Sequence, residues 1–477
     1  MYKSTRGLEG IHASKAIIDG IASDGGLYVT DIDFSYSQKD FDRLKKLSYK
    51  DLAVEILEKF LDDFTKEEIT DIVYNSYDKT FDIDSIVNVK KAKDKIYFLE
   101  LFHGKTLAFK DVALQVLPNL LSVSKKKNNI NEKTIILTAT SGDTGSAALA
   151  GFEGKEDVEM IVLYPNQGVS EIQEKQMLQY ESKTRHIYAV EGNFDDCQNL
   201  VKKIFSEENN KNLSSANSIN IGRLIPQIVY YFYAYFRIAR KKEKINVVVP
   251  TGNFGDILAG YIAKEMGLPI EKLICASNQN NVLEDFIRTG VYDINRPFKK
   301  SISPSMDILI SSNLERLLYY KLKDCKVIKE LMSDLKNKKV YEVHLDMDEF
   351  VGESISELET FSGIRSVYDY YDYVIDPHTS VAYGSFRKYQ TEHNREKNKV
   401  KTLILSTAHP MKFSKTVSKV FGFDFEDENE AIDFLEKELK VKKPEQLKNL
   451  KENKKTILSI DDASKKIKSI IKECNNG

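Results

Sequence analysis

The 477-residue sequence contains no tryptophan and only four cysteines, none of them spaced as C-x-x-C. Scattered cysteines argue against structural zinc, so no metal site is expected, and they favour a reducing compartment. Neither sign of charge is in excess, because 70 Lys and Arg face 72 Asp and Glu, for a net charge of -2. Without a basic surplus, neither a nucleic-acid partner nor a membrane surface is expected.

Long apolar runs are also missing. The most apolar stretch, 228–236, is rich in tyrosine and stops at Arg237, which is too short for a bilayer and predicts a buried helix. The N-terminus lacks the apolar core of a secretory signal. We therefore expect a cytoplasmic monomer or homodimer, and the chain length predicts two or three domains.

What the sequence does contain is a change of pattern near residue 94. The preceding stretch has helical apolar spacing over 51–60 and a capping box at Thr65–Glu68. After a strand-like run at 95–101, apolar strands alternate with helices; the clearest strands are 134–139, 160–165 and 245–250. Such alternation predicts parallel sheets covered by helices, with ligands at the carboxyl ends of the strands.

Two lysine-rich segments complete the expected organisation. Residues 125–131 are predicted to be a solvated loop, and the tail after Lys437 a helical surface element.

The loop from Gly252 to Asp256 lies between an apolar strand and a helix. Its glycines allow a tight turn whose N–H groups point at an anion, and the helix start adds a favourable dipole. An ordinary strand-to-helix turn is the alternative. The chain here matches neither G-x-x-x-x-G-K-[ST] nor G-x-G-x-x-G, so the pattern favours a phosphate ligand that is neither a nucleoside triphosphate nor a dinucleotide.

The loop from Thr140 to Gly145 also joins a strand to a helix. Its hydroxyls and free N–H groups suit a carboxylate or a second phosphate. A helix cap supplied by Ser141 or Asp143 explains the local pattern equally well.

Lys110 follows the apolar residues 107–109 and opens a helix with an apolar stripe. Burial there lowers the pKa of its amine, and a neutral amine can attack an aldehyde to form a Schiff base. Local grounds alone favour the alternative, a surface lysine with a buried stem paired to Asp111.

These segments, in this order, resemble threonine synthase, a fold-type-II pyridoxal-phosphate family related to the tryptophan synthase β subunit. The resemblance extends to 4–7, 24–28, 191–198, 217–220, 304–309 and 406–410. It implies the longer branch of the family, an α/β protein with a mostly helical N-terminal domain over 1–93. A catalytic core of two α/β subdomains with parallel sheets would follow over 94–413, and a C-terminal helical extension over 414–477.

The resemblance also implies roles for individual residues. The cofactor, pyridoxal 5'-phosphate, would be bound by Lys110 as a Schiff base, by Thr407 at its pyridine nitrogen, and at its phosphate by Gly252, Asn253, Phe254, Gly255 and Asp256. The substrate carboxylate would be held by Ser141, Gly142, Asp143 and Thr144. The substrate phosphate would be held by Asn217, Ser218 and Arg223.

The implied reaction converts O-phospho-L-homoserine and water to L-threonine and phosphate, with Lys110 moving protons at Cα and Cβ. Alternatives are a phospholyase that releases a 2-oxo acid, a dehydratase or cysteine synthase, and a non-catalytic phosphate-ligand binding protein. Three positions depart from the family pattern near these sites: Lys105, Ile221 and Gly222.

Overall fold

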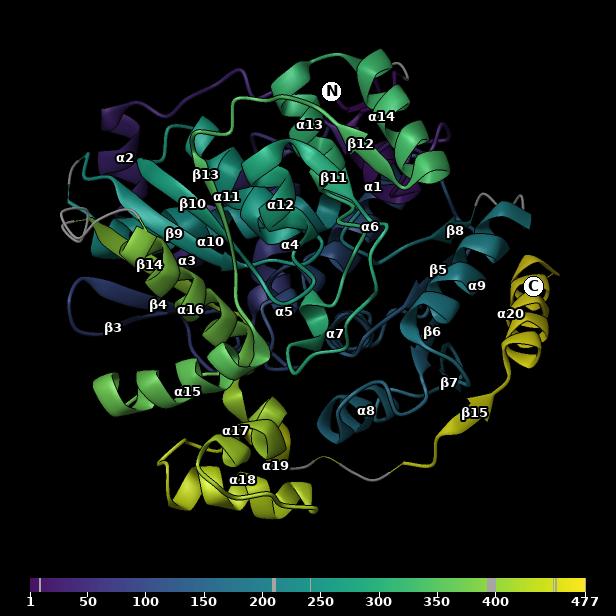
Figure 1. The fold of residues 1–477 in the computed structure, drawn as a ribbon. Coiled ribbons are helices and arrows are strands. Elements are labelled where there is room, and N and C mark those ends of the chain that lie inside the picture. Colours follow the sequence, from purple (N-terminus) through teal and green to yellow (C-terminus); the bar gives the residue numbers. More distant parts are fainter. Residues whose placement is uncertain are drawn as a thin grey trace.

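The computed structural model describes residues 1–7, 10–207, 212–240, 242–392, 400–448, 450 and 453–476. Two mostly parallel sheets form the body of the chain (Figure 1). The larger one has the strand order β13 (Phe350–Ser354), β10 (Ile270–Ser277), β9 (Ile245–Pro250), β14 (Lys401–Ser406), β4 (Ile96–Glu100) and β3 (Asn88–Lys91). Only the β3–β4 pair in this sheet is antiparallel.

The smaller sheet is parallel throughout. Its order is β15 (Thr456–Leu458), β7 (Arg185–Val190), β6 (Val158–Pro165), β5 (Thr134–Ala139) and β8 (Leu213–Ser214). The prediction of α/β architecture with two parallel sheets is confirmed. Two short antiparallel pairs lie outside both sheets: β1 (Lys3–Ser4) with β2 (Tyr28–Val29), and β11 (Val291–Asp293) with β12 (Val340–Glu342).

Helices connect the strands. The first half of the chain contains α1 (Ala13–Asp19), α2 (Gln38–Leu44), α3 (Tyr49–Leu57), α4 (Lys66–Tyr77), α5 (Lys110–Leu114), α6 (Leu117–Lys127), α7 (Asp143–Gly151), α8 (Glu171–Leu178), α9 (Phe194–Glu207) and α10 (Ile221–Ile238). The second half contains α11 (Gly255–Glu265), α12 (Val282–Thr289), α13 (Leu314–Leu322), α14 (Cys325–Lys338), α15 (Glu357–Tyr371), α16 (Pro377–Glu392), α17 (Ser414–Val420), α18 (Glu428–Lys437), α19 (Glu445–Lys448) and α20 (Ile460–Asn476). Short 3-10 turns cover Pro304–Met306 and Pro410–Phe413.

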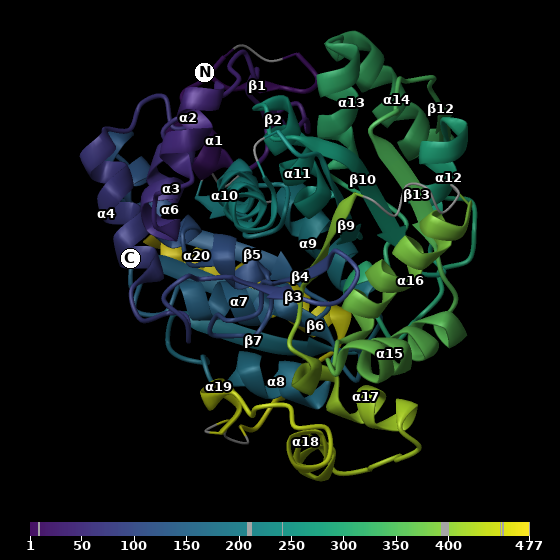
Figure 2. The ribbon, with the colours of Figure 1, turned by 90° about the vertical axis from the view of Figure 1, so that its left-hand side faces the viewer.

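Helix α10 is the buried helix predicted from the tyrosine-rich run. Nearly all of its side chains are buried, and the N-terminal helices pack beside it (Figure 2). The rings of Tyr49 on α3 and Tyr233 on α10 meet edge to face with centroids 5.2 Å apart. The predicted capping box at Thr65 is confirmed at the start of α4. Among the described residues, no helix is long and apolar enough to cross a membrane.

Two predictions about lysine-rich segments are wrong in part. Residues 125–127 form the last turn of α6 rather than a loop, and Lys125 is buried with its ammonium 2.9 Å from the Asp157 carboxylate. The C-terminal tail is not only helical, because β15 adds a parallel strand beside β7 and α20 then packs against α9 (Figure 1). Both placements depend on distant partners, Asp157 for Lys125 and strand β7 for the tail. The sequence of a lysine-rich segment does not identify such partners.

Candidate active site

The predicted cofactor residues follow three adjacent strands of the larger sheet. Strands β4, β14 and β9 are parallel neighbours, and they lead to Lys110, Thr407 and Gly252 respectively. Carboxyl ends of parallel strands meet at one edge, where such sheets bind ligands. The loop that begins at Thr140 reaches the site from β5 in the smaller sheet.

Lys110 is buried, with only 9 % of its surface exposed. Its Nζ lies 3.5 Å from Ser305 Oγ and 4.0 Å from Asp143 Oδ2. Burial, helped by the positive charges of Arg223 and Lys412, lowers the pKa of the Lys110 amine to about 8, although Asp143 opposes the shift. The structure therefore does not support a surface lysine paired with Asp111.

Asp143 occupies the first turn of α7, where its carboxylate meets two ammonium groups. Its Oδ1 lies 2.8 Å from Nζ of Lys412, and its Oδ2 faces Lys110. Burial alone would raise the pKa of Asp143, but the charges of Lys412 and Lys110 outweigh it and hold the pKa well below its usual range. A paired anion is poorly suited to hold the substrate carboxylate directly, so only the backbone N–H of Asp143 suits the predicted role.

The Thr140 loop is shaped by its own first side chain. Thr140 Oγ1 accepts hydrogen bonds from the N–H groups of Gly142, at 3.0 Å, and Gly145, at 2.9 Å. Gly142 has φ +120°, and a Cβ there would lie 2.5 Å from the Gln173 side chain. The flanking Ser141 and Thr144 are half-buried. Both residues therefore keep part of their surface exposed.

The Gly252 loop presents unpartnered amides. Among the described residues, no acceptor is found for the backbone N–H groups from Gly252 to Ile257. The turn needs Phe254 in the left-handed region, at φ +62°, and a Cβ on Gly252 would lie 2.7 Å from the Ser305 carbonyl oxygen. Free amides at the start of a helix fit a phosphate group.

Asp256, at the end of this loop, turns away from that cradle. Its Oδ1 accepts hydrogen bonds from the hydroxyls of Tyr230, at 2.5 Å, and Tyr231, at 2.7 Å. Burial raises the pKa of Asp256 to about 6, although the two tyrosines oppose the shift. Its side chain stabilises the packing of α11 on α10, which leaves only its backbone amide for the predicted phosphate contact.

The predicted substrate-phosphate group lies beside the cofactor loop. Asn313 Nδ2 donates to the backbone carbonyls of Ser218 and Asn253, both at 3.2 Å. Arg223 is 3 % exposed rather than a surface arginine, and its Nη1 donates to the Ala216 carbonyl at 2.9 Å. Its Nε is buried without a partner among the described residues, and burial lowers the pKa of the guanidinium to about 10. A buried arginine with a free donor fits an anionic ligand.

The departures Ile221 and Gly222 immediately precede Arg223 at the start of α10. A Cβ on Gly222 would lie 2.9 Å from Leu117 Cδ1. Because that atom is the end of a flexible side chain, a larger residue here would require only a shift of the Leu117 side chain. Arg223 follows as the third residue of α10 and is buried.

Thr407 is 5 % exposed, and its carbonyl accepts a hydrogen bond from the Phe109 N–H at 2.8 Å. This bond ties the segment after β14 to the residue before Lys110. The predicted contact of Thr407 with the pyridine nitrogen stays a prediction.

Sequence reasoning missed several residues that meet at the site: Ser305, Asn313 and Lys412. Ser305 and Lys412 lie in or just beyond segments that carry the family resemblance, which is the signal that would have found them. Nothing in their local spacing marks them as site residues, because each reaches the site from a distant part of the chain.

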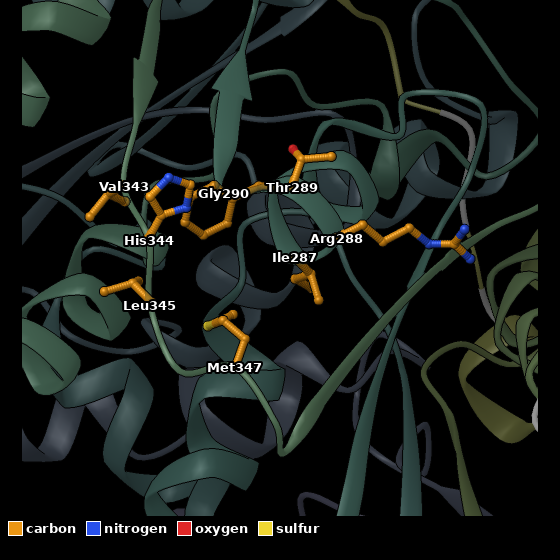
Figure 3. A pocket seen from close by; sticks show the side chains of 9 residues that line it. Ile287, Arg288, Thr289, Gly290, Val343, His344, Leu345 and Met347 are labelled. Atoms are coloured by element: carbon orange, nitrogen blue, oxygen red, sulfur yellow. The ribbon is translucent and has the colours of Figure 1, made fainter.

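A different pocket, of about 150 Å³, lies beside α12 (Figure 3). It is lined by Phe286, Ile287, Arg288, Thr289, Gly290, Val343, His344, Leu345 and Met347. None of these is a predicted site residue.

Comparison with known proteins covers almost the entire chain. Residues 1–77 match the family "Threonine synthase N terminus", 85–406 match "Pyridoxal-phosphate dependent enzyme", and 379–471 match "Threonine synthase, C-terminal". Threonine synthase of Saccharomyces cerevisiae is 37% identical over 99% of this chain and 98% of its own length. Threonine synthase-like 1 of Homo sapiens is 37% identical over 85% of this chain and 57% of its own length. The crystal structure of pyridoxal-phosphate-bound threonine synthase from Brucella melitensis superposes with a TM-score of 0.87 at 33% identity, covering 100% of this chain and 99% of that one.

Proposed function

We propose that this chain, which belongs to the threonine synthase family of fold-type-II pyridoxal-phosphate enzymes, uses Lys110 as the lysine that binds the cofactor. It is a carbon–oxygen lyase acting on phosphates, and it converts O-phospho-L-homoserine and water to L-threonine and phosphate in the last step of threonine biosynthesis. The observation that carries the assignment of Lys110 is its place at the junction of both sheets, buried and beside Asp143.

The described residues fit the cofactor. The unpartnered amides from Gly252 to Ile257, after strand β9, suit its phosphate. Lys110 follows β4, which is separated from β9 only by β14 in the same sheet. Thr407 supplies a neutral hydroxyl for the ring nitrogen. When bound, pyridoxal phosphate supplies an electron sink for carbanion chemistry.

The work of the protein is to place anions and move protons. Arg223, with Asn217 and Ser218, binds the substrate phosphate by charge-assisted hydrogen bonds. Ser141, Thr144 and the amides of their loop other than those of Gly142 and Gly145, which donate to Thr140, bind the substrate carboxylate. The Lys110 amine, with a pKa lowered to about 8, takes and returns protons at Cα and Cβ as general base and acid, a role that needs a pKa near the working pH.

Product analysis tests the function. Purified protein with pyridoxal phosphate and O-phospho-L-homoserine is expected to release phosphate and threonine in equal amounts. Release of phosphate with a 2-oxo acid and ammonia would instead identify a phospholyase. Lys110→Ala is expected to lower kcat by at least about 10²- to 10⁴-fold, the usual contribution of a positioned acid–base group. Lys105→Ala is a matched control, because Lys105 lies in the same loop but points to Glu153, at 3.0 Å.

Arg223→Met tests the phosphate grip separately. Loss of a charge-assisted contact worth about 1.5–3 kcal/mol is expected to raise KM by about 10- to 150-fold. An unchanged KM for the phosphorylated substrate would contradict this role for Arg223.

We further propose a cytoplasmic location, which is supported by the absence of a disulfide between any of the four cysteines, all within the described residues. A monomer or homodimer remains the prediction for its oligomeric state.

A further inference from the structure

Lys412 is a fully buried cation at the junction of the two sheets. It lies in the 3-10 turn after β14 of the larger sheet and has 0 % exposed surface. Its Nζ reaches Asp143 of the smaller sheet, and it also donates to the Thr106 carbonyl at 2.6 Å. A lysine is rarely buried completely unless it is paired. The pairing therefore joins the Asp143 loop to the loop that leads to Lys110.

The Asp143 carboxylate divides its two oxygens between two lysines. Oδ1 faces Lys412 and accepts a hydrogen bond from Gln173 Nε2 at 2.9 Å. Oδ2 faces Lys110, at 4.0 Å, and accepts from Ser305 Oγ at 3.3 Å. The short contact belongs to Lys412 and the long contact to Lys110.

The remaining charged groups around these lysines come from two elements, α10 and α5. Arg223, on α10, acts on Lys110 as a second positive charge. Asp111, on α5, accepts two hydrogen bonds from Thr106, both at 2.8 Å, and lies within the field of Lys412. Asp143 is thus the carboxylate that contacts both ammonium groups.

We propose that Lys412 is a positioning residue for Lys110. By binding Asp143, Lys412 fixes the position of that carboxylate and neutralises most of its charge. Asp143 then positions the Lys110 nitrogen without strongly stabilising its protonated form. This inference rests on the proposed function, in which Lys110 carries the cofactor.

Removal of the Lys412 charge is expected to raise the pKa of the Lys110 nitrogen, for two reasons. A repelling positive charge near Lys110 disappears, and the negative charge of Asp143 then acts on Lys110 alone. Both changes favour the protonated Lys110 nitrogen. That nitrogen must then lose its proton at higher pH.

The test is a pH titration of the visible absorbance of the cofactor-loaded protein, which needs no substrate. In Lys412→Met, the transition of the Lys110–cofactor chromophore is expected to move to higher pH by about one pH unit or more. Lys412→Arg, which keeps the charge, is expected to recover most of the wild-type titration. Lys419→Met is the matched control, because Lys419 is exposed and pairs with Asp424 at 3.1 Å. An unshifted Lys412→Met titration would overturn the proposal.

A double-variant cycle separates positioning from loss of folding. Asp143→Asn combined with Lys412→Met removes both buried charges together, which is better tolerated than removing one. If Lys412 acts through Asp143, adding Lys412→Met to Asp143→Asn moves the titration little. A shift as large as in the wild-type background would overturn the proposal. If Lys412→Met alone does not fold, a shift of about one pH unit or more between Asp143→Asn and the double variant would overturn it. Circular dichroism checks the fold of each variant.

The outcome also distinguishes this inference from the proposed function. If the wild-type protein forms no chromophore that Lys110→Ala abolishes, the role of Lys110 itself fails. If that chromophore is present and the cycle shows no coupling, only the role of Lys412 fails.

Discussion

Asp143 and Asp256 occupy equivalent places in two strand-to-helix loops, yet their surroundings are opposite. Each is buried in the first turn of the helix that follows a parallel strand. Asp143 faces two lysines, which hold its pKa well below the usual range, whereas Asp256 faces two tyrosine hydroxyls and burial raises its pKa to about 6. The Thr140 loop thus carries a permanent buried charge beside Lys110. In the Gly252 loop, the carboxylate of Asp256 instead accepts hydrogen bonds from two uncharged hydroxyls and holds α11 against α10, behind the amides that suit a phosphate. Equivalent position in a motif does not give equivalent electrostatics.

The largest expected effect separates the two carboxylates by stability. Asp143→Asn leaves Lys412 buried without a counter-charge, and we expect it to lower the free energy of unfolding by about 3–5 kcal/mol. Asp256→Asn retains an amide oxygen that accepts from Tyr230 and Tyr231, so its effect at pH 7 is expected to be much smaller. Urea denaturation of both variants measures the difference. Equal losses would remove the contrast between the loops.

The pH dependence of stability provides a sharper comparison. Because the pKa of Asp256 in the folded protein is raised, its contribution to stability is full below its unfolded pKa and is lost as pH rises to about 6. Relative to wild type, Asp256→Asn should therefore gain up to about 3 kcal/mol between pH 4 and pH 6 and remain constant above.

The contribution of Asp143 to stability depends on pH in the opposite direction. Its lowered pKa gives stability that is present at neutral pH and is lost only as pH falls below the usual aspartate range. Denaturation series at several pH values test both signs. Parallel curves for wild type and Asp256→Asn between pH 4 and pH 6 would contradict the assignment for Asp256.

The smallest effect concerns the cradle itself. Gly252→Ala places a Cβ 2.7 Å from the Ser305 carbonyl oxygen. Such overpacking costs about 1–3 kcal/mol and is expected to weaken pyridoxal-phosphate binding by about 5- to 150-fold. Gly255→Ala is the matched control, because its Cβ would have its nearest contact at 3.4 Å, with Asn313 Nδ2. Cofactor titration followed by fluorescence compares the two. Equal affinities would show that the cradle tolerates a side chain at Gly252.

Prediction from sequence succeeded where the signal is local. Apolar runs that end at glycine-rich turns predicted β5 and β9 with the bounds observed, Thr134–Ala139 and Ile245–Pro250. Thr65 and Glu68 form the predicted capping box at the start of α4, which is chemistry contained within four residues. The prediction of a solvated loop was wrong at 125–127, because a distant carboxylate, Asp157, makes burial of Lys125 possible.

The site divides in the same way. The sequence by itself determined the two loops, the candidate lysine and, through the family resemblance, the cofactor and reaction, because backbone turns and helix starts are properties of short segments. Only the tertiary structure decided that Asp143 pairs with Lys412, that Asp256 binds tyrosines, and that Arg223 is buried with a free donor. These contacts join residues from different elements, and in the two carboxylate cases burial and neighbouring groups, rather than residue type, set the pKa.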